Sequence, residues 1–353
     1  MSGSEIDLLI IGAGPAGCSA AVQFKRLGGR PVLLDRDGRA GGLVANAFRV
    51  ENYPGTERPL RGLELAERLG RHLDRFGLGV ETGVVTSVRP VERRVKEPPP
   101  SISDWHPDGE QLGEPGESQR SGFRVTGDFG EMQARSVVIA CGTVPSKAAI
   151  PGESLPGARL FYEVNDLLPF LPRTAAVVGG GEAALDYALT LADSGTRVSV
   201  LVRGQTLRAS GRLVDMVGKE PRITVMTGTP VHELQKPSSS RVDVLIPGRR
   251  LSVDGVLLAV GRRSAADAMM PPPPPPLPGR GPGGSAAVRP PSRAPSPSCL
   301  TSIPGLFIAG DARLGGLGQA GIAVGDGLWC AAAAAAFLSG DAVGSGSPVS
   351  ARE

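Results

Sequence analysis

The chain has 353 residues, of which 41% are hydrophobic and 21% are charged, which is enough for two ordinary domains and a sizeable core. Its formal net charge of +3 comes from three arginines in residues 271–297, a segment without acidic residues, while the rest of the chain has 35 basic and 35 acidic side chains. Because the charge is otherwise balanced and only 4% of the residues are aromatic, the composition argues against a nucleic-acid partner.

One pattern occurs twice along the chain. An apolar strand is predicted at residues 6–11, followed by a helix at 15–28 and a second strand at 30–35. The same order of strand, glycine-rich turn, helix and strand returns in residues 174–203. Units of this kind build parallel, doubly wound sheets, so the predicted fold class is α/β with two Rossmann-like dinucleotide-binding domains. Further strands are predicted at 136–142, 254–262 and 305–312, with a final helix through 319–338.

Two polar segments interrupt this pattern. Residues 97–120 divide a predicted β-hairpin formed by 84–91 and 122–129, and residues 271–298 begin with six prolines. Neither segment has enough apolar surface to offset the entropy lost on ordering, so both are predicted to be disordered insertions. For the second segment, recognition by a proline-binding groove and a shifted reading frame are the alternatives.

The cysteines give no sign of a metal site or of a local redox pair. Cys18, Cys141, Cys299 and Cys330 are far apart in the sequence, and the chain has neither a C-x-x-C motif nor a cysteine–histidine cluster. The amino terminus is acidic and its apolar run is only as long as a strand, so no signal peptide is predicted. The apolar stretch "WCAAAAAAFL" is too short for a membrane span and predicts a packed helix. We therefore expect a cytoplasmic protein without metal or membrane contacts.

The first glycine-rich turn, "GAGPAG", has the features of a dinucleotide site. Gly12 allows the tight turn, Gly14 lets the backbone approach a pyrophosphate, and Gly17 allows close packing of helix on strand. The amino terminus of the helix supplies unpaired N–H groups for the phosphates. Asp35 ends the second strand, where a carboxylate can bind a ribose hydroxyl. The alternative is a purely structural glycine turn.

The second turn contains Gly179 and Gly181, with Ala184 in the place of the third glycine. The strand that follows ends near Arg203 and Arg208 and carries no acidic residue there. Arginine suits the 2′-phosphate of NADP, whereas an acidic residue would suit NAD, so NADPH is preferred and NADH stays possible. The alternative for these arginines is an ordinary solvated surface.

Taken in order, six stretches make the chain similar to the low-molecular-weight thioredoxin reductases. They are "GAGPAG", "AGGLVANAFRVENYPG", "VVIACGTVPS", "VVGGGEAALDYAL", "LLAVGRR" and "TSIPGLFIAGDA" with the later "GQAGIAVGDG". The resemblance covers nearly the whole chain apart from the two polar segments. It implies an FAD domain made of residues 1–148 and 299–340, with an NAD(P) domain at 149–263 inserted between them. Residues 264–298 would form a Pro-rich segment and 341–353 a flexible tail. A homodimer is the usual state of that family.

The resemblance also implies the cofactor contacts. For FAD these are Gly12, Gly14, Pro15, Ala16, Gly17, Asp35, Arg36, Gly42, Leu43, Asn52, Val85, Ala140, Gly142, Gly310, Asp311, Gln319 and Ala320. For NADP they are Gly179, Gly180, Gly181, Glu182, Ala183, Ala184, Arg203, Arg208, Gly261 and Arg262. For Asp311, a helix N-cap or turn is the alternative role.

The chain departs from the family pattern where the redox-active cysteines would be. The family's Cys-x-x-Cys-Asp falls on "YEVND", so Tyr162 and Asn165 replace the two cysteines while Asp166 remains. A phenol and an amide cannot replace a dithiol as an electron relay. Other departures are Leu43 where the family has Gln, Cys141 where it often has Thr, and "VRG" at 202–204 in place of the family's "HRR".

The function predicted from these features is an FAD-dependent NAD(P)H oxidoreductase that passes electrons to an external acceptor without a protein dithiol. The acceptor would be ferredoxin, flavodoxin, a quinone or another small molecule. Tyr162, Asp166 and Cys141 are the candidate catalytic residues, although loop packing for Tyr162 and simple burial for Cys141 are the plainer interpretations. The alternatives are a non-catalytic flavin-binding scaffold or redox sensor, and a thioredoxin reductase that uses other thiols.

Overall fold

The computed structural model of the protein describes residues 6–96, 117–270, 299–314 and 318–339. Its first sheet has seven strands in the order β3-β2-β1-β6-β5-β4, with β17 also paired to β6. Strand β1 (Ile6–Ile11) lies between two parallel neighbours, which explains its apolar composition. The other strands are β2 (Pro31–Asp35), β3 (Glu81–Thr82), β4 (Val85–Lys96), β5 (Glu117–Gly127), β6 (Gly130–Ile139) and β17 (Leu306–Ile308).

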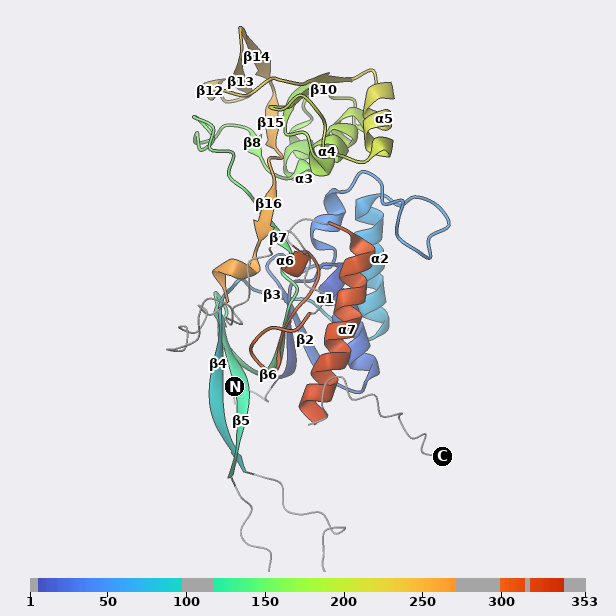
Figure 1. The fold of residues 1–353 in the computed structure, drawn as a ribbon, viewed down its shortest axis with the longest axis vertical. Helices are drawn as coiled ribbons and strands as arrows, with labels where there is room; N and C mark the ends of the chain where they lie inside the picture. Colours follow the sequence, from blue (N-terminus) through green and yellow to red (C-terminus); the bar gives the residue numbers. More distant parts are fainter. Residues whose placement is uncertain (1–5, 97–116, 271–298, 315–317, 340–353) are drawn as a thin grey trace, which may run out of the picture.

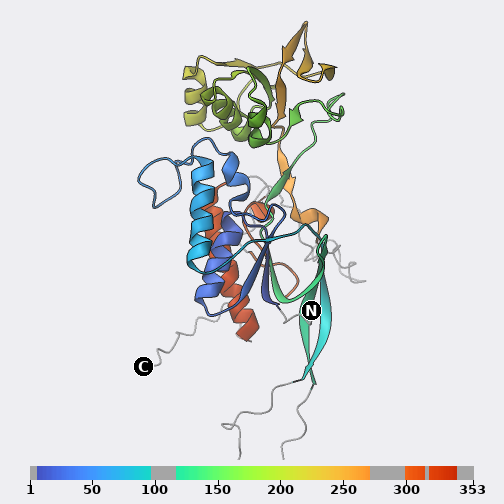
Figure 2. The same cartoon turned by 180° about the vertical axis from the view of Figure 1, so that it is seen from behind.

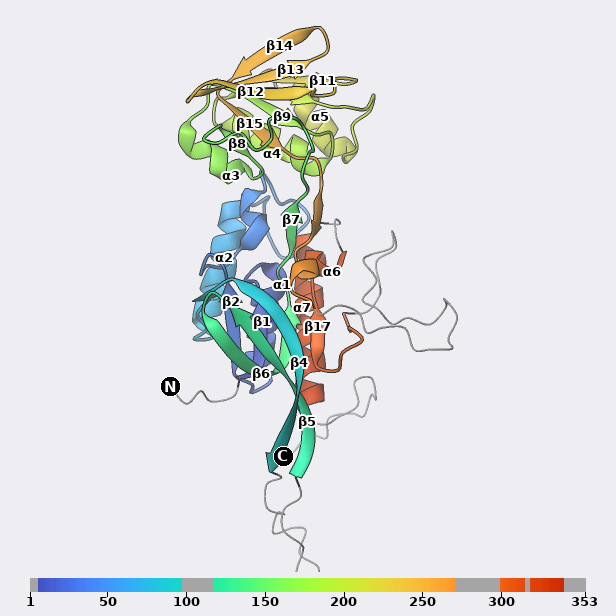
Figure 3. The same ribbon diagram turned by 90° about the vertical axis from the view of Figure 1, so that its left-hand side faces the viewer.

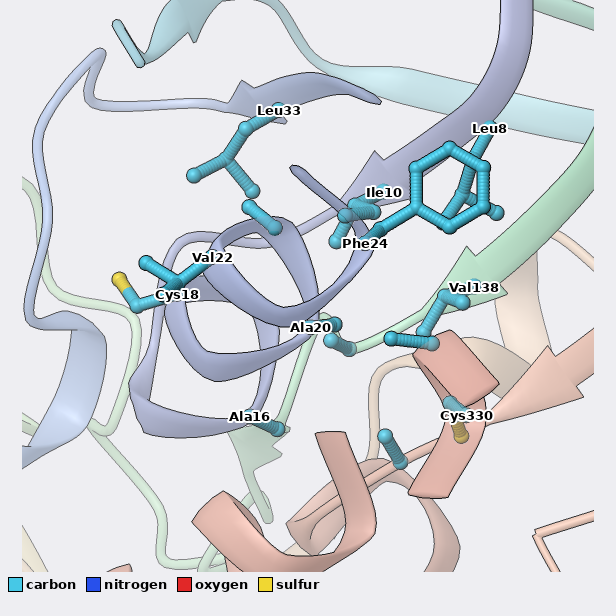
Figure 4. Close-up of a cluster of buried hydrophobic side chains, with 14 of the residues drawn as sticks. Leu8, Ile10, Ala16, Cys18, Ala20, Val22, Phe24, Leu33, Val138 and Cys330 are labelled. Atoms are coloured by element: carbon cyan, nitrogen blue, oxygen red, sulfur yellow. The ribbon is translucent and has the colours of Figure 1, made fainter. Parts of the chain in front are cut away.

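Alternate residues of β1 pack into the core on opposite faces of the sheet. Leu8 and Ile10 pack against helices α1 (Pro15–Arg26), α2 (Gly62–Arg75) and α7 (Ala320–Ser339), as Figure 4 shows for part of this cluster. Leu9 and Ile11 point to the opposite face and pack against β4, β5 and β17. The three helices therefore cover one face of the sheet (Figures 1 and 2).

Helix α7 is the one helix among the described residues that is long and apolar enough to cross a membrane. Its inner face nevertheless packs closely on α1. A Cβ on Gly327 would lie 2.1 Å from the carbonyl oxygen of Ala16, and the Ser19 hydroxyl donates to the carbonyl oxygen of Val324 at 2.9 Å. This contact accounts for the small, buried residues on the inner face of α7, whereas Ile322, Leu328 and Trp329 are exposed.

The second sheet is entirely parallel, with the order β11-β10-β9-β15-β8. It lies at the end of the molecule opposite the β4–β5 hairpin (Figure 1). A three-stranded antiparallel sheet, β12-β13-β14, packs beside it. The strands are β8 (Leu160–Phe161), β9 (Thr174–Val178), β10 (Arg197–Leu201), β11 (Ile223–Met226), β12 (Glu233–Ser238), β13 (Arg241–Ile246), β14 (Arg249–Val253) and β15 (Gly255–Leu258), and the helices are α3 (Val164–Leu167), η3 (Leu168–Phe170), α4 (Glu182–Asp193) and α5 (Gly211–Lys219).

Two short strands connect the sheets. The chain leaves the first sheet through β7 (Thr143–Pro145) and returns through β16 (Arg262–Ser264), and these two strands pair antiparallel. Figure 3 shows β7 in this connection between the two parts of the molecule. The 3-10 turn η4 (Ala266–Ala268) follows, and η1 (Gly42–Asn46) and α6 (Asp311–Leu314) lie in the first part.

The predicted α/β class with two Rossmann-like units is confirmed, but several boundaries change. The helix predicted at 15–28 ends at Arg26, and the strand predicted at 305–312 ends at Ile308 because Asp311 already begins α6. The strand predicted at 136–142 ends at Ile139, and the one predicted at 254–262 ends at Leu258, since Gly142 and Gly261 have positive φ values of 66° and 125° and turn the chain out of the sheets. Residues 117–120 were expected in the first insertion, but they extend β5 because its antiparallel register with β4 continues to the Lys96–Glu117 pair. Residues 97–116, including Trp105, and residues 271–298 lie outside the described residues.

Candidate functional site

The first glycine turn joins β1 to α1 and leaves no room for side chains on one side. Gly12 has φ +104°, and a Cβ there would lie 2.4 Å from the carbonyl oxygen of Ala140. A Cβ on Gly17 would lie 1.8 Å from the carbonyl oxygen of Gly12. Both positions therefore require glycine for packing alone.

Gly14 differs, because a Cβ there would meet no heavy atom within 4 Å. Its backbone borders open space at the amino terminus of α1, where Pro15 is the first helical residue. Within the described part of the chain, the N–H groups of Gly14, Ala16 and Gly17 have no hydrogen-bond partner. The turn thus presents unpaired donors and a helix amino terminus to that space, which suits a phosphate group.

Asp35 is fixed at the edge of the same turn. Its Oδ2 accepts the N–H of Ala13 at 2.8 Å and its Oδ1 accepts the N–H of Asp37 at 2.9 Å. Arg36 is exposed beside it, with its Nε 3.7 Å from Oδ2 of Asp37. The two backbone donors hold the Asp35 carboxylate in place, and each oxygen keeps a lone pair for a further donor.

Further predicted FAD residues converge on this turn. Gly42 begins η1, and a Cβ on it would lie 3.2 Å from the Cα of Gly14. Gly310 has φ +64°, and a Cβ there would lie 3.1 Å from the Cβ of Ala16. Asp311 follows Gly310, and burial raises the pKa of its carboxyl group. Three segments that are distant in the sequence thus meet around the amino terminus of α1.

Asn52 and Gln319 form a second contact of this region, through a hydrogen bond from Nδ2 of Asn52 to Oε1 of Gln319. Ala320, the first residue of α7, packs with Tyr53 and Val50. The other predicted FAD residues lie around these contacts: Ala140 and Val85 are buried, Gly142 is in the turn before β7, and Leu43 is half-buried in η1.

The second glycine turn repeats the geometry of the first. A Cβ on Gly179 would lie 2.2 Å from the carbonyl oxygen of Ala259 and 3.2 Å from the Cβ of Ala184, so a methyl group fits at 184. Gly181 caps α4, and the N–H groups of Ala183 and Ala184 have no hydrogen-bond partner among the described residues. Gly180 packs on Val202, which explains why no side chain is present at 180.

Arg208 lies against this turn. Its N–H donates to the carbonyl oxygen of Gly180 at 2.6 Å, and Ser210 donates from its N–H to Oε1 of Glu182 at 3.1 Å. The guanidinium groups of Arg203 and Arg208 are exposed and make no hydrogen bond or ion pair to any described residue. Both arginines are therefore available to an anion at the carboxyl edge of the second sheet.

Arg262 is also a predicted NADP residue, but its contacts differ from those of the other residues in that group. Its Nε and Nη2 donate to the Oγ1 and carbonyl oxygen of Thr143, at 2.8 and 2.9 Å, and its Nη1 donates to Oε1 of Glu163 at 2.6 Å. Gly261 accepts the N–H of Ser146 through its carbonyl oxygen at 2.9 Å. Both residues belong to the β7–β16 connection, and the nucleotide role of Arg262 stays a prediction.

The "YEVND" segment is held by hydrogen bonds at both ends. The Tyr162 hydroxyl donates to Oε1 of Glu153 at 2.6 Å and accepts from Nζ of Lys147 at 2.9 Å. Burial, followed by the contact with Glu153, raises the pKa of Tyr162. Asn165 donates from its Nδ2 to the carbonyl oxygen of Ala45 in η1 at 3.1 Å. The side chains of Tyr162 and Asn165 are thus both hydrogen-bonded within the protein.

The two other candidate catalytic residues have perturbed pKa values. Partial loss of hydration, with a smaller effect of Glu163, raises the pKa of the Asp166 carboxyl group, although much of this residue is exposed. Cys141 is half-buried next to β16, and burial raises the pKa of its thiol to about 12. Because thiolate is the reactive form, Cys141 is a poor nucleophile at neutral pH.

The sequence did not single out Glu163, Asp186 or Phe48, which join the two parts of the molecule. Glu163 accepts from Tyr187 at 2.6 Å and from Asn46 at 3.1 Å, in addition to Arg262. Phe48 follows η1, yet its ring is buried in the core around α4, and its N–H donates to Oδ2 of Asp186 at 2.8 Å. In the sequence, the only local sign of these contacts is the apolar side chain of Phe48 in the stretch after residue 46.

A scan against family models matches residues 6–327 to the "Pyridine nucleotide-disulphide oxidoreductase" family. The chain belongs to this family. The chain is similar to the thioredoxin reductase of Treponema pallidum, with 28% identity over 95% of this chain and 98% of the relative. It is also 28% identical to the thioredoxin reductase of Bacillus subtilis, over 72% of this chain and 74% of the relative.

Solved structures agree with this membership. The thioredoxin reductase of Lactococcus lactis superposes with a TM-score of 0.72 and 25% identity, over 95% of this chain and 100% of that one. The thioredoxin reductase of T. acidophilum has the same fold, with a TM-score of 0.71 and 23% identity over 95% and 99% of the chains. The protein is therefore a thioredoxin reductase-like, FAD-dependent pyridine nucleotide oxidoreductase.

Proposed function

We propose that the protein transfers electrons from NADPH through FAD to an external acceptor, without a protein dithiol in the "YEVND" segment. The acceptor would be a small molecule or a small redox protein. The proposal is supported by the resemblance, which places Tyr162 and Asn165 where the family has its cysteines, and by the hydrogen bonds of these two side chains to Glu153 and Ala45. Neither side chain can accept electrons by thiol–disulfide chemistry.

The residues around the first turn fit FAD. Gly14 and the amino terminus of α1 would hold the pyrophosphate, and Asp35 would bind a ribose hydroxyl. Asn52 and Gln319, which already contact each other, would border the flavin ring, as the resemblance implies. When bound, FAD would supply the two-electron carrier between the nicotinamide and the acceptor.

The residues around the second turn fit NADPH. The amino terminus of α4 would bind the pyrophosphate, and Arg203 and Arg208 would bind the 2′-phosphate, since neither guanidinium is neutralised by a described residue. NADH would lack that contact and would bind more weakly. We further propose the division into an FAD domain (1–148 and 299–340) and an NAD(P) domain (149–263), assembly as a homodimer, and a cytoplasmic location.

The proposal is tested by reconstituting the protein with FAD and adding NADPH under anaerobic conditions. We expect the flavin absorbance near ~450 nm to be lost. An absorbance that both NADPH and NADH leave unchanged would contradict hydride transfer and would favour a flavin-binding scaffold. Assays with ferredoxin, flavodoxin, quinones and thioredoxin would then identify the acceptor class.

Thioredoxin reduction through other thiols is the second candidate, because the relatives in Treponema pallidum and Bacillus subtilis are thioredoxin reductases. Such a reaction needs an accessible thiol pair. Of the four cysteines, Cys18, Cys299 and Cys330 are buried and Cys141 is half-buried. Reduction of thioredoxin that is lost when all four cysteines are replaced by serine would support this candidate.

A further inference from the structure

A cavity lies between helix α2 and the loop that precedes it, and its volume is about 730 Å³. Small-molecule sites in proteins have volumes of roughly 300–1,000 Å³. The loop contributes Tyr53, Gly55 and Thr56 to the lining, and α2 contributes the other lining residues. None of the described residues that line this cavity is among the proposed contacts of FAD or NADP. The cavity is therefore a separate feature of the first part of the molecule.

The loop side of the cavity is held by its own contacts. At the base of the loop, the N–H of Val50 donates to the carbonyl oxygen of Leu60 at 2.7 Å, and the N–H of Leu60 donates back at 3.1 Å. The Thr56 hydroxyl donates to the carbonyl oxygen of Tyr53 at 3.0 Å. Tyr53 also packs against a small buried cluster that includes Leu65 of α2. The loop thus forms a fixed wall that projects beside the start of α2 (Figures 1 and 2).

The α2 side of the cavity has an apolar floor and a cationic rim. Leu65 and Leu69 form the floor and are only 2% and 8% exposed. Arg68, His72 and Arg75 also line the cavity and are exposed. Their spacing of four and three residues places them on one face of the helix, next to the two leucines. The cavity therefore offers apolar contact below and positive charge at its edge.

The positive charge of the rim is only partly balanced. Arg68 donates to Glu64 at 2.9 Å, and Nη1 of Arg71 lies 3.6 Å from Oε2 of Glu67. Both pairs are in contact with solvent, so they hold their arginines weakly. Arg75 makes no hydrogen bond or ion pair with any described residue. No acidic residue is among the described residues that line the cavity. An anion can thus bind Arg75 without displacing a partner.

We propose that this cavity binds a small organic anion with a flat apolar body, of the class of the aromatic carboxylates. The carboxylate binds Arg68 and Arg75 at the rim, because guanidinium groups match carboxylate oxygens in geometry and charge. The ring system lies on Tyr53, Leu65 and Leu69, which supply an aromatic face and buried apolar surface. Neither a neutral ring compound nor a small hydrophilic anion uses both parts of the cavity. The site does not depend on the proposed function.

The test measures binding of naphthoate by isothermal titration calorimetry. The full-length protein is saturated with FAD and NADP⁺, so that the two glycine turns are not available to the probe. We expect naphthoate to bind at one site, and naphthol and acetate to bind at least about tenfold more weakly. Naphthol has the same rings without the charge, and acetate has the charge without the rings. No binding of naphthoate at millimolar concentration, or equal affinities for naphthoate and naphthol, would overturn the proposal.

A pair of double variants locates the site. Arg68→Ala, Arg75→Ala should lower the affinity for naphthoate at least about tenfold and leave the thermal midpoint nearly unchanged, because both side chains are exposed. Arg197→Ala, Arg222→Ala is the control, since it removes the same charge from exposed positions beside the second sheet. An unchanged affinity in the first variant, or the same loss in both variants, would overturn the placement. Binding of naphthoate at this cavity by a protein that never binds FAD would contradict the proposed function and leave this site standing.

Discussion

The Arg262 guanidinium donates to the Glu163 carboxylate at 2.6 Å and thereby joins β16 to the start of α3. Glu163 also accepts from Tyr187 in α4 and from Asn46 in η1. One carboxylate thus binds groups from the connection, from the second sheet's helices and from the first part of the molecule. Through these contacts the segment around Glu163 joins the two parts of the molecule.

Replacement of Glu163 by Gln should destabilise the protein by about 2 kcal/mol, because charge-assisted hydrogen bonds from Arg262 and Tyr187 are weakened in a mostly buried site. The control is Glu67→Gln, whose ion pair with Arg71 is exposed on both sides and whose loss should change stability by less than about 0.5 kcal/mol. Urea unfolding of both variants measures the difference. Equal losses of unfolding free energy for the two substitutions would show that Glu163 has no special role in stability.

Asp186 gives the stability a specific pH dependence. Burial, with a smaller effect of Glu182, raises the pKa of its carboxyl group to about 6, although the N–H of Phe48 opposes the shift. The folded state therefore binds a proton that the unfolded state has already lost, and the stability from this group falls as the pH rises from about 4 through about 6. Over that window wild type should lose up to about 3 kcal/mol relative to Asp186→Asn. The free energies of unfolding of both proteins are measured across this pH window. A difference between the two proteins that stays constant with pH would contradict the prediction.

Gly14→Ala separates folding from cofactor binding. A Cβ at Gly14 meets no protein atom, so the variant should fold with a thermal midpoint like that of wild type. The methyl group would enter the space assigned to the pyrophosphate, so FAD affinity should fall at least about tenfold. Gly218→Ala, in α5, is the matched control, because its Cβ also meets open space but far from the turn. Fluorescence titration with FAD that gives the same affinity for all three proteins would refute this placement.

Arg203 and Arg208 should set the preference for the phosphorylated nucleotide. The double variant Arg203→Ala, Arg208→Ala should raise the KM for NADPH about tenfold and leave the KM for NADH nearly unchanged, because only NADPH carries the 2′-phosphate. Arg197→Ala is the control, since this exposed arginine is the first residue of β10 and lies at the opposite end of the strands from the glycine turn. Steady-state kinetics with both nucleotides decides the matter, and parallel changes for NADPH and NADH would contradict a 2′-phosphate site.

Local patterns predicted the strands and helices around the two glycine turns, because apolar period and glycine chemistry act over a few residues. Gly12 and Gly179 were recognisable for that reason, and both have the positive φ and the close backbone approach that exclude a side chain. The ends of the strands were less predictable. β16 exists because Arg262 to Ser264 pair with β7, which is far away in the sequence, after Gly261 has turned the chain out of the second sheet.

The contacts that distinguish this chain were not predictable, because each joins residues from separate elements. Phe48 has no local feature that places it in the core around α4, and Glu163 has none that pairs it with Arg262. The four cysteines are far apart in the sequence, yet Cys18, Cys299 and Cys330 belong to one buried cluster around the first sheet and its helices. Sequence distance is a poor guide wherever the partners lie on different layers of the core.

The most direct test of the account is NADPH-dependent reduction of a dye acceptor by the variant in which Cys18, Cys141, Cys299 and Cys330 are all serine, compared with wild type at equal FAD content. A flavin route that needs no thiol predicts turnover within about twofold of wild type. A loss of more than about a hundredfold, with FAD still bound and the protein still folded, would show that a thiol carries the electrons and would contradict the central claim.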